Sequence, residues 1–325
     1  MKRRPLGGTG LSVPEIGFGT WGLGGTAYGP VDEAVAEAAL LRALELGVDF
    51  FDTSDMYGDG RSEELLGRVF QGRRDQILLA TKGGNLPHSG MHMPQDFSAR
   101  HLSAALDRSL TRLRTDHVDL YQLHSPVLSD LERNAEVIPL LQGWVRAGKI
   151  RTFGISVRSP ADGLAAIQRF GFPVVQVNFN MIDQRAAENG LFALAREKGA
   201  GLIARTPLVF GYLTGALSGN EKFVGADHRA NWPADQLKRW AEAPRLFDFL
   251  ALPGRRSIVQ ACLRFCLDQD AVSTVIPGMM APREVEEDAQ ASALPPLSPE
   301  ERRRIEDLYR THDFYDPSAK RRGKQ

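Results

Sequence analysis

Short hydrophobic runs alternate with amphipathic segments along nearly the whole chain. The segment DEAVAEAALLRALELG, for example, places Val35, Ala39, Leu40 and Ala43 at helical spacing, directly after an apolar run. The eight runs that predict buried strands are EIGFGTW, FFDTS, ILLATK, DLYQLH, FGISV, VVQVNF, LIARTP and VSTVIPG. Eight strand–helix pairs in sequence predict a parallel sheet, and eight strands are the number that closes this sheet into a barrel. The predicted fold class is therefore α/β, a single (β/α)8 TIM barrel over residues 1–325.

Three segments fall outside the repeating pattern. Residues 1–14 hold a glycine-rich turn between β-prone pieces, which predicts a hairpin that caps the barrel floor. Residues 208–256 follow the seventh strand and hold Gly211, Gly215, Gly219 and Gly225 before an amphipathic stretch, which predicts a cofactor lid with an extra helix. Loops of this length are either functional lids or disordered, and the place at a strand's C-terminal end favours a lid. Residues 311–325 are expected to form a C-terminal tail.

Polar residues stand where three of the predicted strands end. Asp52 and Tyr57 lie in FFDTSDMYG, Lys82 closes ILLATK, and His124 closes DLYQLH. The carboxyl ends of barrel strands are where such barrels carry out their chemistry. A lysine can lower the pKa of a neighbouring tyrosine toward neutral pH, a carboxylate keeps the lysine charged, and an imidazole can bind a carbonyl oxygen. Each residue alone is more often structural, but together they predict a proton-delivery site.

Charge and cysteine content exclude several classes of protein. The 40 basic and 40 acidic residues give no net charge, so nothing indicates a nucleic-acid or membrane partner. No stretch has the length of a membrane span, and the N-terminus lacks the apolar core of a signal peptide. The two cysteines, Cys262 and Cys266, share one predicted helix face, which favours core thiols over a disulfide or redox pair. A reduced, cytoplasmic protein is expected.

Two further patterns have simpler explanations than a ligand site. Gly17, Gly19 and Gly22 have the spacing of a dinucleotide-binding fingerprint, but Gly24, Gly25 and Pro30 delay the helix that should follow at once. We therefore expect a tight loop with the side chains of Thr20 and Trp21 facing the pocket. His88 and His92 are four residues apart, but a metal site needs further ligands, so we expect a pocket rim and no metal.

The order of these motifs resembles the aldo-keto reductase superfamily over nearly the whole chain. The matching segments are Arg4–Gly7, Gly17–Trp21, Asp52–Gly58, Ser62–Glu63, Thr81–Lys82, Asp119–His124, Gly148–Arg151, Gly154–Ser156, Gln176, Pro207–Leu208, Leu213–Gly215 and Ile276–Gly278. The resemblance implies a barrel that binds an extended nicotinamide cofactor without a Rossmann domain. It also implies that Tyr57 is the general acid, that Lys82 and Asp52 tune it, and that His124 orients the carbonyl.

The resemblance further implies a set of cofactor contacts. Thr20, Trp21 and Asp52 would approach the nicotinamide, and Ser156 and Gln176 would hold its carboxamide. Exposed amides of the seventh loop would wrap the pyrophosphate, at Leu208, Gly211, Leu213 and Gly215. The adenosine end would meet Gly278, Arg283 and the pair Glu287–Asp288.

Several positions depart from the family pattern. Val157 follows Ser156 where asparagine is usual, Arg205 replaces the aromatic residue that stacks on the nicotinamide, and Ala216 replaces a lysine. Met279 and Met280 stand where a basic residue is common, which leaves Arg283, with Arg229 of the loop, to bind a 2′-phosphate. The pair Glu287–Asp288 ends in an acid instead of an asparagine. NADPH is the expected cofactor, and NADH is the alternative.

The sequence therefore predicts an enzyme that reduces an aldehyde or ketone, reversibly, with a small-molecule carbonyl as its partner. Two alternatives have the same fold. One is a redox-sensing regulatory subunit with weak catalysis, and the other is an isomerase-type barrel that uses these acid–base groups without a cofactor. The second alternative would not require Ser156, Gln176 or the glycine-rich loop. The sequence does not specify the carbonyl compound or the oligomeric state.

Overall fold

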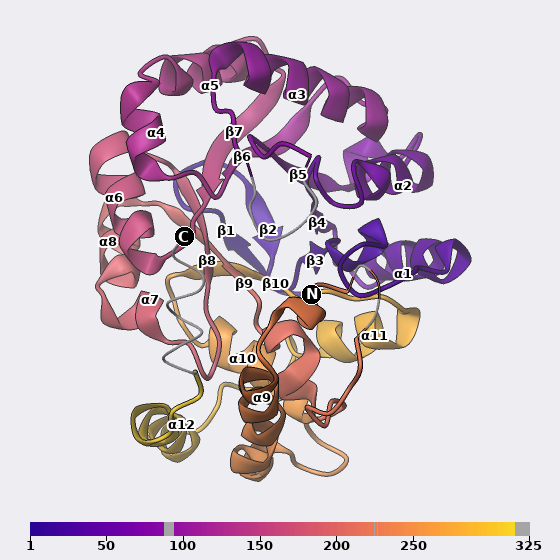
Figure 1. Cartoon of the computed structure of the whole chain (residues 1–325), viewed down its shortest axis with the longest axis vertical. Coiled ribbons are helices and arrows are strands. Elements are labelled where there is room, and N and C mark those ends of the chain that lie inside the picture. Colours follow the sequence, from indigo (N-terminus) through magenta and orange to yellow (C-terminus); the bar gives the residue numbers. More distant parts are fainter. Residues whose placement is uncertain (88–93, 224, 226, 316–325) are drawn as a thin grey trace.

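Eight parallel strands form a barrel (Figure 1) in this computed structural model, which describes residues 1–87, 94–223, 225 and 227–315. The strands neighbour one another in chain order, and parallel bridges between Ile16 and Val275 and between Gly19 and Gly278 join the first to the last. They are β3 (Phe18–Gly19), β4 (Phe50–Asp52), β5 (Leu78–Gly83), β6 (Val118–His124), β7 (Ile150–Ser156), β8 (Val174–Asn178), β9 (Gly201–Arg205) and β10 (Val272–Ile276). The predicted (β/α)8 barrel is confirmed.

Helices surround the strands on the outside of the barrel (Figure 1). The α-helices are α1 (Glu33–Glu45), α2 (Arg61–Val69), α3 (Ala99–Leu113), α4 (Leu128–Arg133), α5 (Val137–Arg146), α6 (Pro160–Phe170), α7 (Arg185–Glu188), α8 (Leu191–Lys198), α9 (Ala234–Leu246), α10 (Ile258–Leu267), α11 (Pro282–Gln290) and α12 (Pro299–Thr311). Short 3-10 turns η1 (Gly22–Gly24) and η2 (Arg74–Gln76) precede β4 and β5. No described helix is long and apolar enough to cross a membrane.

A hairpin of β1 (Arg3–Pro5) and β2 (Ser12–Pro14) closes the end of the barrel where the strands begin. Leu6 packs with side chains from inside the barrel, such as Phe50 and Leu120, in one buried cluster. The turn lies close against the start of β9, because the N–H of Gly8 donates to the carbonyl of Gly199 over 2.7 Å. The opposite end, where the strands finish, is therefore left for the site.

The loop after β9 contains the predicted extra helix, α9, preceded by η3 (Val209–Thr214) and η4 (His228–Asn231) and followed by η5 (Asp248–Leu250). Its core is aromatic: Trp240 is buried, with ring centroids of Phe210 and Trp232 at 5.7 and 4.8 Å. Thr206, Val209 and Phe210 all have positive φ values, between 49° and 58°. Such conformations are costly for residues with a Cβ atom and tend to gather at functional segments.

Two helical regions differ from the sequence expectation. The periodic segment before Gly148 predicts one helix of about 13 residues, which corresponds to α5, and the structure adds the short helix α4 before it. The segment after β8 predicts one helix but divides into α7 and α8 at Gly190, whose φ of 89° ends a regular helix. There the apolar spacing continues across a break that is made by the local backbone.

The remaining elements that the sequence singled out lie mostly in the core. Cys262 and Cys266 are both buried on α10 as free thiols, as predicted for core residues. Helix α12 ends at Thr311, and Phe314 packs beyond it with its ring 6.0 Å from that of Phe247. The rest of the expected tail, 316–325, lies outside the described residues, and so do His88 and His92.

Candidate active site

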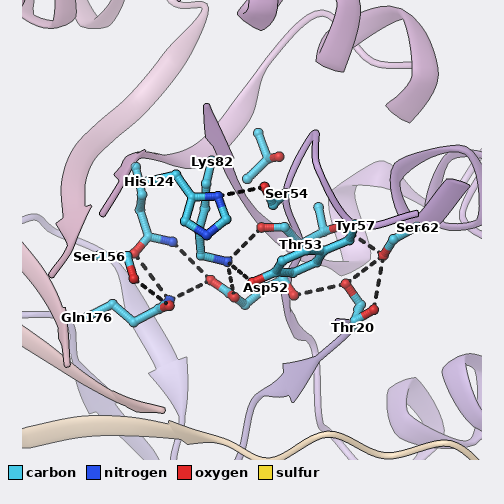
Figure 2. Close-up of polar contacts among 12 residues, drawn as sticks. Thr20, Asp52, Thr53, Ser54, Tyr57, Ser62, Lys82, His124, Ser156 and Gln176 are labelled. Atoms are coloured by element: carbon cyan, nitrogen blue, oxygen red, sulfur yellow. Dashed lines mark hydrogen bonds and ion pairs between the residues drawn. The ribbon is translucent and has the colours of Figure 1, made fainter. Parts of the chain in front are cut away.

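Adjacent strands bring the four predicted catalytic side chains together at one end of the barrel (Figure 2). Asp52 is the last residue of β4, Lys82 is in β5 next to it, and His124 is the last residue of β6. Tyr57 lies in the short loop between β4 and α2, where its ring centroid is 5.9 Å from that of His124. The parallel order β4–β5–β6 is what places these three strand ends side by side.

Lys82 is at the centre of the group and has 0% exposure. Its Nζ donates to Oδ1 of Asp52 over 2.5 Å, to the Thr53 carbonyl over 2.8 Å and to the hydroxyl of Tyr57 over 3.1 Å. Burial lowers the pKa of Lys82, but the Asp52 carboxylate and Tyr57 outweigh that effect, so the net direction is upward. Lys82 therefore carries its charge at neutral pH, in contact with both Asp52 and Tyr57.

The second carboxylate oxygen of Asp52 is held by two amides. Nε2 of Gln122 and Nε2 of Gln176 donate to Oδ2 over 2.9 and 2.8 Å. The hydroxyl of Ser156 donates to Oε1 of Gln176 over 3.2 Å, which extends the network to the end of β7. Gln122 was not among the predicted site residues, although a polar residue in the middle of a buried strand, two before His124, was a signal for it.

The pKa of Tyr57 differs from the sequence expectation of a lowered value. Burial raises it above 10, and the positive charge of Lys82 opposes but does not overcome this effect. The expected lowering toward neutral pH is therefore wrong for this structure. The phenol keeps its proton at neutral pH, and Lys82 is placed to stabilise the tyrosinate once that proton leaves.

His124 is neutral in this environment. Burial, with the positive charges of Lys82 and Arg205, holds its pKa well below 6.5. Its Nδ1 lies 3.0 Å from the hydroxyl oxygen of Ser54, which fixes the ring at the edge of Tyr57. A neutral imidazole has one N–H that can donate a hydrogen bond, and the proton can be on either nitrogen.

Thr20 and Ser62 form a structural connection behind the site, contrary to prediction. The segment SEELLGRVF predicts a helix with Ser62 as its N-cap, but α2 begins at Arg61 after Gly60, so Ser62 does not cap it. Its hydroxyl instead donates to Oγ1 of Thr20 over 2.7 Å. Thr20 in turn donates to the carbonyl of Asp52 over 3.0 Å and has 0% exposure. The prediction that the side chain of Thr20 faces the pocket is therefore wrong. Trp21 lies nearer the mouth, with its ring 6.4 Å from that of Tyr57.

The predicted pyrophosphate contacts lie in and around η3. The N–H groups of Gly211 and Leu213 both donate to the carbonyl of Leu208, and that of Gly215 donates to the carbonyl of Tyr212. These three amides are therefore satisfied within the loop, which corrects the expectation of exposed donors at these positions. The loop would have to change its hydrogen bonds before these amides could bind a pyrophosphate.

Arg205, at the end of β9, has a buried nitrogen without a partner. Its Nη2 donates to the carbonyl of Val157 over 3.0 Å, but its Nε has no hydrogen bond within the described part of the chain. An unpaired buried donor is costly, and such groups often mark a place where a ligand binds. The guanidinium acts electrostatically on Tyr57 and Asp52, so this donor lies near the catalytic group.

The predicted adenosine contacts are divided between surface and core. Gly278 is exposed at the rim, and Arg283 is exposed at the start of α11. Asp288 is only 3% exposed, and burial together with the charges of Glu287 and Glu284 holds its pKa well above 3.8. The structure therefore does not present Asp288 as a surface carboxylate.

Arg229, the loop arginine considered for a phosphate, already has a partner. It pairs with Asp227 at 2.6 Å, and its guanidinium stacks over Tyr28 and Phe223 at 4.9 and 4.3 Å. These contacts hold the loop after β9 against the loop after β3. His228 adds a further contact between the two loops, since its Nδ1 lies 2.9 Å from the carbonyl oxygen of Ala27. Among the described residues, no cluster of histidine, cysteine and acidic side chains could hold a metal ion.

These residues fit a nicotinamide cofactor, but not one bound in Rossmann fashion. The buried, unpaired Nε of Arg205 and the polar pair Ser156 and Gln176 offer hydrogen-bonding groups beside the catalytic four. Helix α1 begins only at Glu33, well after the glycines of β3, so no helix N-terminus lies at that turn to bind a pyrophosphate. The structure thus supports the rejection of the dinucleotide fingerprint.

Comparison with known proteins agrees with this geometry. The model of the Aldo/keto reductase family matches residues 15–310. The uncharacterized oxidoreductase YqkF of Bacillus subtilis is 30% identical over 96% of this chain and 99% of its own, and aldo-keto reductase YhdN of the same organism is 32% identical over 88% and 87%. Among solved structures, the holo form of aldo-keto reductase AKR11C1 from Bacillus halodurans is similar with a TM-score of 0.77 and 32% identity, covering 95% of this chain and 96% of that one.

Proposed function

Because the chain belongs to the aldo/keto reductase family, we propose that it reduces an aldehyde or ketone with Tyr57 as the proton donor. Membership of the family makes the protein an NAD(P)H-dependent oxidoreductase that acts on small carbonyl compounds. One observation above all others supports Tyr57 as the proton donor. Nζ of Lys82 contacts both the Asp52 carboxylate and the Tyr57 hydroxyl, so a charged lysine lies beside a phenol that still has its proton.

Each side chain has a separate part in the proposed reduction. When bound, the reduced nicotinamide supplies a hydride to the carbonyl carbon, and the products are an alcohol and the oxidised cofactor. Tyr57 gives the proton of its hydroxyl to the carbonyl oxygen, and Lys82 stabilises the tyrosinate that remains. Asp52 keeps Lys82 charged, and the N–H of His124 orients the carbonyl oxygen before the proton moves.

The cofactor would be held by groups around the catalytic four. We assign Trp21, Ser156, Gln176 and Arg205 to the nicotinamide half. Asp52 accepts a hydrogen bond from Gln176, and Thr20 donates to the carbonyl of Asp52, so these two residues hold Gln176 in place through the network of Figure 2. Arg205 would take the place of a stacking aromatic residue, since a guanidinium is planar. Leu208, Gly211, Leu213 and Gly215 would meet the pyrophosphate after the loop rearranges, and Gly278, Arg283, Glu287 and Asp288 the adenosine end.

We further propose that NADPH binds more tightly than NADH. Arg283 is exposed at the N-terminal end of α11, where a helix favours negative charge, and it has no ion pair with any described residue. Glu284, which would repel a phosphate, accepts a hydrogen bond from the N–H of Met280 over 2.6 Å and is therefore turned toward its own loop. Arg229 is bound to Asp227, so Arg283 is the better candidate for a 2′-phosphate.

The proposal is tested by following the absorbance of NADPH and NADH separately with a panel of aldehydes and ketones. Reduction of at least one carbonyl class, with loss of activity in the Tyr57→Phe variant, is the expected result. Cofactor binding is measured independently by fluorescence titration. The regulatory-subunit alternative would be favoured if both cofactors bind and no carbonyl in the panel turns over.

A further inference from the structure

Ser54 and Asp55 stand between Asp52 and Tyr57 in the chain, and neither has a part in the reduction as proposed. The hydroxyl oxygen of Ser54 lies 3.0 Å from Nδ1 of His124 and 3.1 Å from Oδ1 of Asp55. It also accepts a hydrogen bond from the N–H of Met56 over 3.2 Å. The hydroxyl has a single proton, so it donates either to His124 or to Asp55 but not to both.

We propose that Asp55, acting through Ser54, is a positioning residue that sets which ring nitrogen of His124 carries the proton. The inference rests on the proposed function in one respect, because His124 is the group that orients the carbonyl. It concerns two side chains that are separate from the proton donor and its lysine. The observation that carries it is the continuous hydrogen-bond chain from Asp55 through Ser54 to His124.

A protonated Asp55 gives the arrangement that suits carbonyl reduction. Its acid O–H donates to the Ser54 oxygen, and the Ser54 hydroxyl then donates to Nδ1 of His124. The proton of the neutral ring is consequently on Nε2, which has no hydrogen-bond partner among the described residues. Nε2–H is then free to donate to a carbonyl oxygen.

An ionised Asp55 reverses the chain. The Ser54 hydroxyl now donates to the carboxylate, and its oxygen accepts from Nδ1–H of His124. The ring stays neutral, but its proton has moved to Nδ1, and Nε2 becomes an acceptor that repels a carbonyl oxygen. The net change is the loss of one proton from Asp55 to solvent, while the Nε2–H bond of the ring is replaced by an Nδ1–H bond and the Ser54 hydroxyl changes its acceptor.

The surroundings of Asp55 place this change near neutral pH. The charged and titratable groups that act on it are Glu63 of α2, Arg108 and Arg112 of α3, and Tyr121 of β6. Arg108 and Arg112 act to lower the pKa of Asp55, and Arg112 is paired with Glu63 at 2.6 Å, but the opposing effects outweigh both arginines. Burial and the Glu63 carboxylate raise the pKa of Asp55 to about 7. His124 does not gain a second proton in this range, because its own pKa is held well below 6.5.

The test is nitrogen NMR of the histidine ring in cofactor-free protein, uniformly labelled at histidine, between pH 6 and pH 8. His124 is assigned by its absence from the spectrum of the His124→Gln variant. In the wild type we expect the proton to move from Nε2 to Nδ1 as the pH rises. In Asp55→Asn it should remain on Nε2 throughout, since the amide N–H₂ donates to Ser54 as the protonated acid does. In Ser54→Ala the shift with pH should be lost.

Asp59→Asn is the matched control, because Asp59 is an exposed acid in the same loop and should leave the shift unchanged. As a second readout, kcat for carbonyl reduction should fall about tenfold per pH unit above the Asp55 pKa in the wild type and Asp59→Asn, but not in Asp55→Asn. The same tautomer at pH 6 and 8 in the wild type would overturn the proposal, and so would a shift that persists in Asp55→Asn or Ser54→Ala. The NMR result needs no catalysis, so it is independent of the test of Tyr57.

Discussion

Nζ of Lys82 lies 2.5 Å from Oδ1 of Asp52, and both side chains are buried. A buried ion pair of this kind is stable only when its remaining hydrogen-bonding groups are also satisfied. Here Oδ2 of Asp52 accepts from two glutamines, and Lys82 also donates to a carbonyl and to Tyr57. The network therefore holds a positive charge at a fixed place next to the phenol.

Replacing Tyr57 with phenylalanine should lower kcat for carbonyl reduction by roughly 10²–10⁴-fold, the usual effect of losing a general acid. The ring of phenylalanine fills the same space, so the fold and the cofactor affinity should change little. Steady-state kinetics and a cofactor fluorescence titration check the two parts separately. Near-normal turnover by this variant would remove Tyr57 from the mechanism.

Replacing Lys82 with methionine should move the alkaline limb of the pH profile for alcohol oxidation to higher pH. The lysine charge is the main cause that lowers the pKa of Tyr57, so its removal leaves burial and the Asp52 charge to raise it further. The variant also leaves Asp52 as a buried, uncompensated charge, which typically costs about 3–5 kcal/mol of stability. The double variant Asp52→Asn/Lys82→Met controls for this cost. A profile of unchanged shape, with weaker binding alone, would assign Lys82 a structural role.

The raised pKa of Asp55 makes folding stability depend on pH. The folded protein keeps the proton up to about pH 7, whereas the unfolded chain releases it near pH 3.8, the ordinary pKa of an aspartate. The folded state therefore binds more protons within this window, and the stabilisation is lost as the pH rises through it. Asp55→Asn should increase the free energy of unfolding at pH 8. This increase should exceed the change at pH 5.5 by roughly 2 kcal/mol.

Urea unfolding at the two pH values checks this expectation, with Asp59→Asn as the control. An equal gain at both pH values would mean that Asp55 has an ordinary pKa in the folded protein.

The loop over residues 208–233 should become more resistant to proteolysis when the cofactor binds. Its amides at Gly211, Leu213 and Gly215 are bonded within the loop, so binding a pyrophosphate through them would require the loop to rearrange, and its aromatic contacts with Trp21 place it over the site. Limited proteolysis with and without saturating NADPH, followed by mass spectrometry of the fragments, measures the effect. Equal cleavage rates in this loop under both conditions would contradict a lid.

Arg283→Ala should weaken NADPH binding by about 1.5–3 kcal/mol, the range for a hydrogen bond to a charged group, and leave NADH binding nearly unchanged. Arg303→Ala removes an exposed arginine from α12 and is the matched control. Fluorescence titration of the wild type and both variants with each cofactor measures the affinities. Equal losses for NADPH and NADH, or a wild type that prefers NADH, would contradict the assignment of Arg283.

The local pattern of apolar and polar residues was sufficient to predict the barrel and the positions of the catalytic side chains. Alternation of apolar runs with helical spacing reflects which residues must be buried, and this depends little on distant parts of the chain. Parallel strands bring their carboxyl ends to one side, so Asp52, Lys82 and His124 could be placed together before any contact was known. The break at Gly190 was not visible, because apolar spacing continues across it.

The tertiary structure alone decided how each polar group is satisfied. Ser62 looked like a helix cap in sequence, but the fold turns it toward Thr20, which removes the Thr20 hydroxyl from the pocket. The two glutamines on Asp52 come from different strands and meet only when the barrel is closed. Nothing in the local sequence specifies such partners, because they depend on side chains far apart in the chain.

The pKa values show the same division most clearly. The sequence by itself determined that a lysine would stand near Tyr57, and hence the sign of its effect on the phenol. Only the tertiary structure decided that burial outweighs that effect, and that Asp55 is enclosed beside Glu63 and linked through Ser54 to His124. The physical reason is that desolvation depends on every atom packed around a group, whereas the sign of a neighbour's charge follows from its residue type alone.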